Sequence, residues 1–236
     1  MSLGPGDLEK VVQMGVPVLL LDTCTALDVL RDITRKTVQL HNLQAAMRLL
    51  TAAELLPKPE LVLVMAEQVT AELADNRDQV EAEARDALDK FHEQAQRVAA
   101  VATLFGAVGT VATAHLRDHV PRAKEVLRRW ETVSLLARQG SDTKGRAMTR
   151  VVSAVPPSRR GKESAKDCLV VETYLETAAQ LRAAQFKSKI VLGSSNTDDY
   201  VDPVSKRLHE RLRADFAVSE IEFAPNFGAM RHLLGL

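Results

Sequence analysis

An uninterrupted apolar run that ends on an acid constrains this chain more than any other stretch. Residues 17–21 (Pro-Val-Leu-Leu-Leu) carry no polar side chain, and Asp22 follows them directly. A strand of this kind is buried on both faces, as in parallel sheets that have helices on each side. Open α/β sheets bind their ligands beyond the carboxyl ends of the strands. The run therefore predicts a central parallel strand that delivers a carboxylate to the ligand-binding edge.

Further strands and helices alternate along the chain. Apolar runs predict strands at residues 61–65 and 190–192, and we expect a last strand at 219–223. We expect helices at 25–31, 37–56, 67–105, 121–137, 164–184, 203–215 and 227–234, and loops at 1–16 and at 139–162, the latter with a short strand at 151–152. This alternation is typical of an α/β fold with a mostly parallel central sheet flanked by helices. We expect a single domain over residues 1–236, with a helical insertion at about 75–150, where no clear strand pattern occurs.

Composition narrows the class of protein. Hydrophobic residues make up 46% of the chain, which is ample for a core, and the only cysteines are Cys24 and Cys168. Two cysteines do not make a disulfide scaffold, so we expect a reducing, cytoplasmic environment. The first 15 residues have no apolar segment typical of a signal peptide, and the longest uncharged run, 98–114, is too rich in Ala, Gly and Thr for a membrane span. We therefore expect no membrane partner.

The formal net charge of zero hides two segments of opposite sign. Residues 67–93 hold nine acids and three bases, and residues 144–166 hold seven bases and one acid. Both patterns are common in solvated helix faces and loops. The basic segment is also where a polyanion would bind.

Acidic and amide side chains follow several of the predicted strands. Asp22 ends the first strand, Glu72 lies on the opening turns of the next helix, and Asp167 starts the helix at 164–184. Asn196 and Asp199 follow the strand at 190–192. Carboxylates at one edge of a sheet raise one another's pKa unless a cation neutralises them, and oxygen ligands suit Mg²⁺ or Mn²⁺. Taken singly, these residues also suit helix starts and turns.

Four short motifs occur in a characteristic order. They are Leu20-Leu21-Asp22-Thr23, Val69-Thr70-Ala71-Glu72-Leu73, Lys166-Asp167-Cys168-Leu169-Val170 and Ser195-Asn196-Thr197-Asp198-Asp199-Tyr200. This series resembles the PIN-domain nucleases over about residues 16–73 and 160–224. The chain departs from the family pattern at Cys24, where a small polar residue is common, and at Tyr200, which replaces Phe. Because 95 positions separate Glu72 from Asp167, the resemblance is to a larger PIN-like protein with a helical insertion.

The resemblance implies a Mg²⁺- or Mn²⁺-dependent endonuclease that hydrolyses phosphodiester bonds, of RNA rather than DNA. A bound cation would activate water and stabilise the leaving oxygen. The implied catalytic metal ligands are Asp22, Glu72, Asp167 and Asp199, with Thr23 and Asn196 as supporting polar residues. The bases expected to contact backbone phosphates, unless they merely belong to a solvated loop, are Arg159, Arg160, Lys162 and Lys166. A homodimer and an antitoxin-like partner stay open.

Two alternative functions are open at this point. A haloacid-dehalogenase-like phosphatase also starts from an acid at a strand end, but it requires a second Asp two residues later, where this chain has Cys24. A non-catalytic PIN-like module for RNA binding or assembly requires no intact set of acids, whereas all four are present here. Both alternatives therefore rank below the nuclease.

Overall fold

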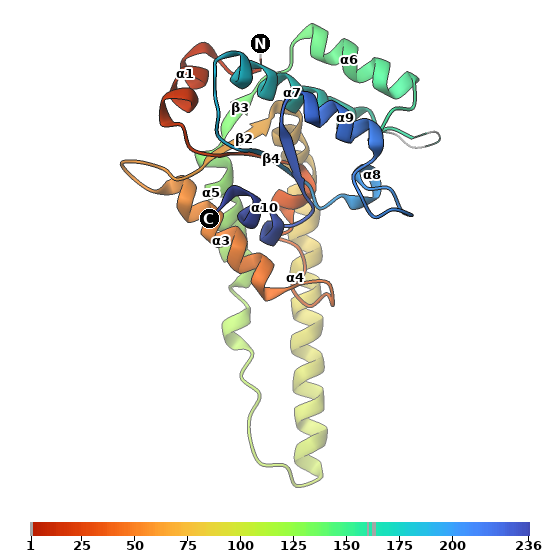
Figure 1. The fold of residues 1–236 in the computed structure, drawn as a ribbon. Helices are drawn as coiled ribbons and strands as arrows, with labels where there is room; N and C mark the ends of the chain where they lie inside the picture. Colours follow the sequence, from red (N-terminus) through yellow and green to blue (C-terminus); the bar gives the residue numbers. More distant parts are fainter. Residues whose placement is uncertain (1, 160, 162–163) are drawn as a thin grey trace.

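The computed structural model describes residues 2–159, 161 and 164–236, and within them the chain forms an α/β fold around one five-stranded sheet (Figure 1). Neighbouring strands are parallel, in the order β3-β2-β1-β4-β5. The strands are β1 (Val18–Leu21), β2 (Val62–Ala66), β3 (Leu135–Ala137), β4 (Ile190–Gly193) and β5 (Ile221–Ala224). The predicted fold class is confirmed, and the apolar run of the first strand lies at the centre of the sheet.

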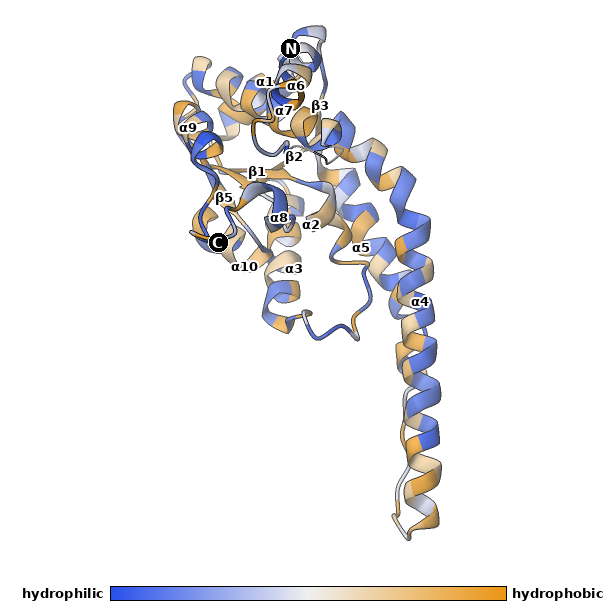
Figure 2. Cartoon of the chain, turned by 90° about the vertical axis from the view of Figure 1, so that its right-hand side faces the viewer, coloured by the Kyte–Doolittle hydropathy of each residue, from blue (hydrophilic) through white to orange (hydrophobic). Residues whose placement is uncertain are grey.

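Helices cover both faces of the sheet (Figure 2). One face carries α3 (Leu40–Glu54), α5 (His119–Val133) and α10 (Phe227–Leu234), and the other carries α7 (Ala165–Ala183) with α1 (Pro5–Met14) and α6 (Ser141–Val152) against it. The remaining elements are α2 (Thr23–Leu27), α4 (Glu67–Leu104), a 3₁₀ turn at Ala114–Leu116, α8 (Thr197–Tyr200) and α9 (Glu210–Val218). Cover on both faces explains why β1, β2 and β4 read as continuous apolar runs.

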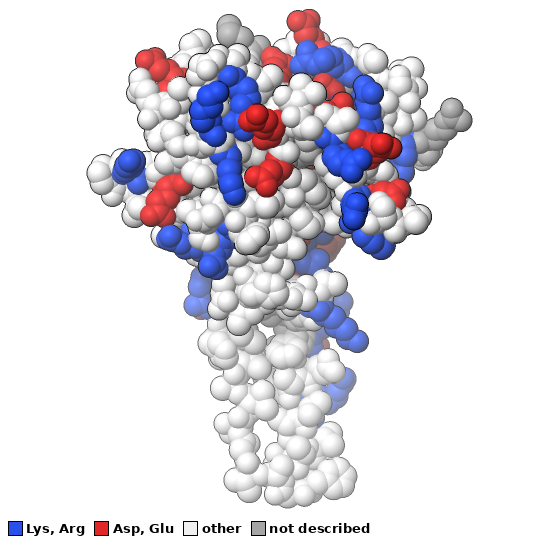
Figure 3. Space-filling model, in the orientation of Figure 1, with Lys and Arg blue, Asp and Glu red and all other residues white. Residues whose placement is uncertain are grey.

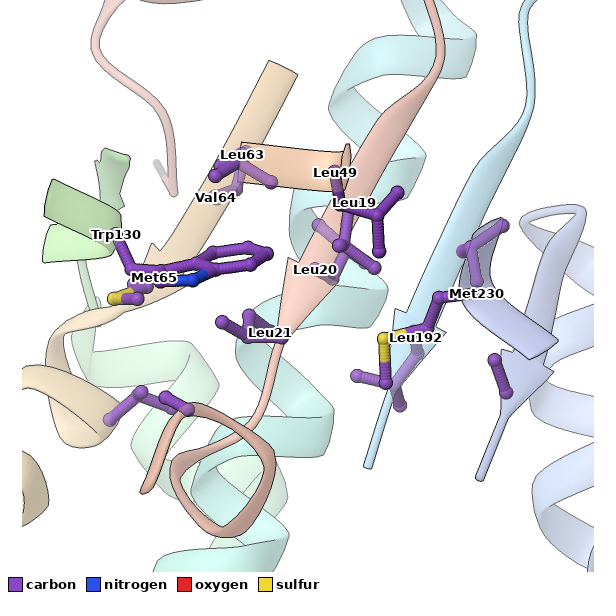
Figure 4. Packing of buried hydrophobic residues seen from close by; sticks show 14 of the residues in the cluster. Leu19, Leu20, Leu21, Leu49, Leu63, Val64, Met65, Trp130, Leu192 and Met230 are labelled. Atoms are coloured by element: carbon purple, nitrogen blue, oxygen red, sulfur yellow. The ribbon is translucent and has the colours of Figure 1, made fainter. Parts of the chain in front are cut away.

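The core is built mainly from aliphatic side chains on the central strands. Leu19, Leu20 and Leu21 are completely buried, and each such side chain contributes about 1.5–3 kcal/mol to folding. Figure 4 shows Met230 of α10 lying against Leu192 of β4. The Met230 side chain also lies close to Gly193, the residue after Leu192. A Cβ atom added to Gly193 would lie 2.4 Å from the methyl carbon of Met230. Glycine at the end of β4 therefore lets α10 pack directly on the sheet.

Several predictions of local structure are wrong. The helix expected at 203–215 begins only at Glu210. Residues 1–16 contain α1, which has Pro5 in its first turn and Gly15 at its end with a φ of 62°. The expected helix at 121–137 ends at residue 133, and β3 follows it and pairs with β2, so the predicted insertion contains a strand. The expected loop at 139–162 contains α6, and no strand forms at 151–152. The strand β3 was missed because its three residues are too few to form a periodic pattern in the sequence.

A long arm projects from the sheet and its helices. Its outgoing limb is α4, whose 38 residues correspond to about 57 Å of helix, and residues 105–118 return beside it to α5 (Figures 1 and 2). At the tip, Leu104, Phe105 and Val108 are at least 85% exposed. Residues 98–116 contain no Lys, Arg, Asp or Glu, and Figure 3 shows the tip without such side chains on the visible face. No helix in the described part of the chain has the length and apolarity needed to span a membrane.

Candidate acidic site at the carboxyl edge of the sheet

Asp22 is the residue around which the site is built. It follows β1 and caps the N-terminus of α2, and its Oδ1 accepts a hydrogen bond of 2.8 Å from the backbone N–H of Thr23. Its Oδ2 accepts a hydrogen bond of 2.6 Å from the hydroxyl of Ser194, the first residue after β4. The residue is only 4% exposed. Two neighbouring parallel strands therefore fix one buried carboxylate where both of them end.

Glu72 joins this group through Thr23. The Thr23 hydroxyl donates to Glu72 Oε2 at 2.8 Å, and the side-chain amide of Gln68 donates to Oε1 at 2.9 Å. Both Gln68 and Glu72 lie on the first turns of α4, directly after β2. Thr23 thus contacts Asp22 through its backbone and Glu72 through its side chain.

Asp199 reaches the same region from the short helix α8. Its side chain is fully buried, and Asn196 donates its amide to Asp199 Oδ2 at 2.7 Å. A guanidinium nitrogen of Arg159 lies 3.5 Å from Asp199 Oδ1, and the Arg159 side chain is 57% exposed. Arg159 therefore stands between a buried carboxylate and solvent.

Asp167 lies in the first turn of α7. Burial is the largest cause that raises the pKa of Cys24 and of Tyr200, and the carboxylates of Asp22 and Asp167 raise it further. The pKa of the Cys24 thiol rises to about 12, so this thiol stays protonated at neutral pH. Asp167 and Asp22 thus act on the same two side chains.

The electrostatics of the site follow from burial and like charge. The pKa of Asp22 is raised from its ordinary 3.8 to about 6, chiefly because the carboxyl is buried. The nearby carboxylates of Glu72 and Asp199 also raise it, while the hydrogen bonds from Ser194 and Thr23 lower it. A cation bound among these acids would lower the pKa of Asp22, against the effects of burial and of the neighbouring carboxylates.

The acids lie near one another, but their side chains do not form a metal centre in this structure. Among the described residues, no three His, Cys, Asp or Glu side chains form a group that could hold a metal ion. The donors that Asp22, Glu72 and Asp199 offer are all oxygens, which is the chemistry that Mg²⁺ and Mn²⁺ prefer. The residues fit such a cation in chemical type, and binding it would require their side chains to move closer together.

The basic segment at 144–166 divides into two parts. Arg150 is 7% exposed and donates to Glu172 of α7 and to Asp215 of α9, and Arg146 pairs with Glu172 and Glu176. These two arginines hold α6 against its neighbours, which explains why a helix replaces the predicted loop. Of the four bases expected to contact phosphate, Arg159 contacts the site and Lys166 lies 4.0 Å from Asp75. Arg160 and Lys162 lie outside the described residues.

Sequence analysis missed several polar residues of the site. Ser194 and Gln68 hold Asp22 and Glu72, and the Tyr174 hydroxyl donates to the carbonyl of Leu21 while accepting from the N–H of Ala66. Ser194 directly follows β4, and Gln68 is the second residue after β2, so position alone could have identified them. Tyr174 lies in the middle of α7, 153 positions from Leu21, and only the packing of that helix brings it to β1 and β2.

The chain matches no protein-family model, no curated protein and no solved structure.

Proposed function

We propose that the chain is a Mg²⁺- or Mn²⁺-dependent nuclease that hydrolyses phosphodiester bonds, with RNA as the expected substrate. One observation carries the proposal: Asp22 is buried where β1 ends and is linked to the β4 loop through Ser194 and to Glu72 through Thr23. Burying the two carboxylates of Asp22 and Asp199 without a cation is costly. A structural role alone does not explain why several acids lie near one another at the edge where α/β sheets bind ligands.

The chain's own residues have distinct tasks in this proposal. Asp22, Glu72, Asp167 and Asp199 would hold the cation, which when bound supplies an activated water and stabilises the leaving oxygen. Ser194 and Thr23 fix the orientation of the Asp22 carboxylate, and Asn196 does the same for Asp199. The exposed guanidinium of Arg159 would contact a backbone phosphate. The protonated thiol of Cys24 is unsuited to the acid role that a dehalogenase-like phosphatase needs there.

The proposal is tested by incubating the protein with labelled single-stranded RNA and DNA in Mn²⁺, in Mg²⁺ and in EDTA. We expect cleavage of RNA with either cation and none in EDTA. Asp22→Asn should abolish cleavage, and Asp75→Asn, an exposed acid one turn beyond Glu72, should leave it unchanged. Cleavage that persists in EDTA would remove the metal-dependent mechanism. If the protein binds RNA but cleaves it in none of the three conditions, the non-catalytic module is favoured.

Metal binding can be measured independently of cleavage. A cation that binds only the folded protein raises stability by RT ln(1 + [L]/Kd), or about 2.7 kcal/mol at a hundredfold excess over Kd. The melting temperature of the parent protein should therefore rise with Mn²⁺, and that of Asp22→Asn should rise much less. Equal rises in both proteins would exclude Asp22 as a ligand. A cytoplasmic location belongs to the same proposal, and the free cysteines Cys24 and Cys168 accord with it.

A further inference from the structure

Tyr200 carries a buried hydroxyl group that the fold leaves without a hydrogen bond. The residue ends the short helix α8, directly after Asp199, and is completely buried. Its phenolic oxygen forms no hydrogen bond with any residue that the structure describes. Burying a hydroxyl in this way is unfavourable, and a phenylalanine of the same shape would avoid the cost. Packing alone therefore does not explain why this position carries a tyrosine.

The only other tyrosine of the chain shows how a buried hydroxyl is normally satisfied. Tyr174 is also completely buried, but its hydroxyl donates to the carbonyl oxygen of Leu21 and accepts a hydrogen bond of 3.0 Å from the backbone N–H of Ala66. These contacts join α7 to β1 and β2, so the Tyr174 hydroxyl stabilises the fold. The Tyr200 hydroxyl makes no comparable contact within the described residues.

The Tyr200 ring is held in place by its neighbours. It stacks on the ring of Phe223 in β5, with centroids 5.5 Å apart and planes inclined by 12°. The backbone carbonyl of Tyr200 accepts a hydrogen bond of 3.0 Å from the N–H of His209. Because the ring is stacked and enclosed, its hydroxyl stays inside the protein. A partner for this hydroxyl must therefore come from the buried site itself.

Carboxylates of the acidic site lie near this hydroxyl. Burial raises the pKa of Tyr200 well above its ordinary value, and the charges of Asp22 and Asp167 raise it further. The phenol therefore keeps its proton and is a hydrogen-bond donor close to two acceptors. The Asp22 carboxylate already accepts one hydrogen bond on each oxygen, from Thr23 and Ser194. Each carboxylate oxygen can accept a second one.

We propose that Tyr200 is a positioning residue of the metal centre, whose hydroxyl donates a hydrogen bond to the Asp22 carboxylate when that side chain moves toward a bound Mg²⁺ or Mn²⁺. The inference rests on the proposed nuclease function and adds a residue to its site. Removing a group that orients a metal ligand typically weakens metal binding by about 10–100-fold. The hydroxyl is then unfavourable in the metal-free protein and favourable in the loaded one.

Tyr200→Phe removes this hydroxyl alone, and Thr177→Val is its matched control. Thr177 is buried on α7, about 15 Å further along the helix than Asp167, and its hydroxyl donates to the carbonyl of Thr173 at 2.8 Å. In EDTA, Thr177→Val should melt about 2–4 °C below the parent protein because it loses this hydrogen bond. Tyr200→Phe should melt at the parent temperature or above it.

Calorimetric titration with Mn²⁺ in the absence of RNA measures the second effect. The Kd of Tyr200→Phe should be about tenfold weaker than that of the parent, and the Kd of Thr177→Val should stay within about twofold. A spectroscopic test uses tyrosine labelled with ¹³C at Cζ, the carbon that bears the hydroxyl. The two tyrosines give two NMR signals, which Tyr200→Phe assigns. Saturating Mg²⁺ should shift the Tyr200 signal, because its hydroxyl gains a hydrogen bond.

Three results would overturn the inference. A Tyr200→Phe variant that melts 2 °C or more below the parent in EDTA would show that the hydroxyl already has a partner, at about the scale of one lost hydrogen bond. An unchanged Kd, or a Tyr200 signal that Mg²⁺ does not move, would show that the hydroxyl gains none. A parent protein that binds no Mn²⁺ would overturn the proposed function as well. Metal binding that depends on Tyr200 without any RNA cleavage would contradict only the nuclease activity.

Discussion

The sheet with its covering helices and the projecting arm are stabilised in opposite ways. Around the sheet, each of the four residues of β1 is fully buried, and even charged groups such as Arg150 are enclosed and paired. On the arm, Phe105 and Val108 are almost fully exposed, and its ion pairs, such as Lys90 with Asp86, lie in solvent. The candidate site therefore depends mainly on the packed part of the molecule. The arm contributes to the site only through the first turns of α4, which carry Gln68 and Glu72.

The sharpest test of this contrast is to truncate one large aromatic residue in each region. Trp130 on α5 is fully buried, with its ring centroid 5.8 Å from that of Phe227, so Trp130→Ala should cost about 3–5 kcal/mol. Phe105→Ala at the tip of the arm should change stability by less than about 0.5 kcal/mol. Chemical denaturation of both variants measures the two values. A cost above about 2 kcal/mol for Phe105→Ala would show that the tip is packed in solution.

Ion pairs supply the next largest difference. Removing the guanidinium in Arg150→Met leaves Glu172, which is 8% exposed in its side chain, without its main partner, and should cost about 3 kcal/mol. Arg146 still contacts Glu172 and keeps the loss from being larger. Lys90→Met on the arm breaks a pair exposed on both sides and should cost less than about 0.5 kcal/mol. Similar costs for the two variants would mean that burial does not set the strength of these pairs.

These residues also show where prediction from sequence stops. The central strands and the acids after them could be predicted because each follows from a local pattern, an apolar run that ends on a polar residue. Arg150 looked like part of a solvated basic loop because its partners, Glu172 and Asp215, lie 22 and 65 positions away along the chain. The strand β3 escaped prediction because its three residues pair only with β2, across the whole length of the arm. Long-range pairing of this kind leaves no periodicity in the sequence.

The acid at the edge of the sheet should make the packed region sensitive to pH. Because the pKa of Asp22 is raised to about 6 in the folded protein from its ordinary 3.8, the folded state binds a proton more tightly than the unfolded state does. Its contribution to stability is therefore greatest below about pH 4 and is lost as the pH rises through 6. In EDTA, Asp22→Asn should stabilise the protein at pH 8 by on the order of 2 kcal/mol, and by much less at pH 4.5.

The pH experiment has a control on the arm. Asp89→Asn makes the same isosteric change at an exposed acid of α4. Its melting temperature should be nearly equal to that of the parent protein at each of the two pH values. An Asp22→Asn variant that is less stable than the parent at pH 8 would show that hydrogen bonds from Ser194 and Thr23 outweigh burial and repulsion. In that case the acid would be a structural cap of α2, and a cation at this position would have no unfavourable charge to neutralise.

The smallest effect is expected when the outer arm is removed. His92 and Thr113 are joined by a side-chain hydrogen bond, so the two limbs are close together at this level. Replacing residues 94–112 by a linker of about four Gly and Ser residues can therefore reconnect them, since four residues span about 13 Å. The deletion removes the exposed apolar tip and leaves the buried residues of α4, Val69, Leu73, Ala84 and Leu88, in place.

We expect the deletion variant to have a melting temperature within about 2 °C of that of the parent and unchanged metal-dependent cleavage. Loss of cleavage with an unchanged melting temperature would place part of the substrate-binding surface on the arm, whereas a large drop in melting temperature would show that the arm supports the fold.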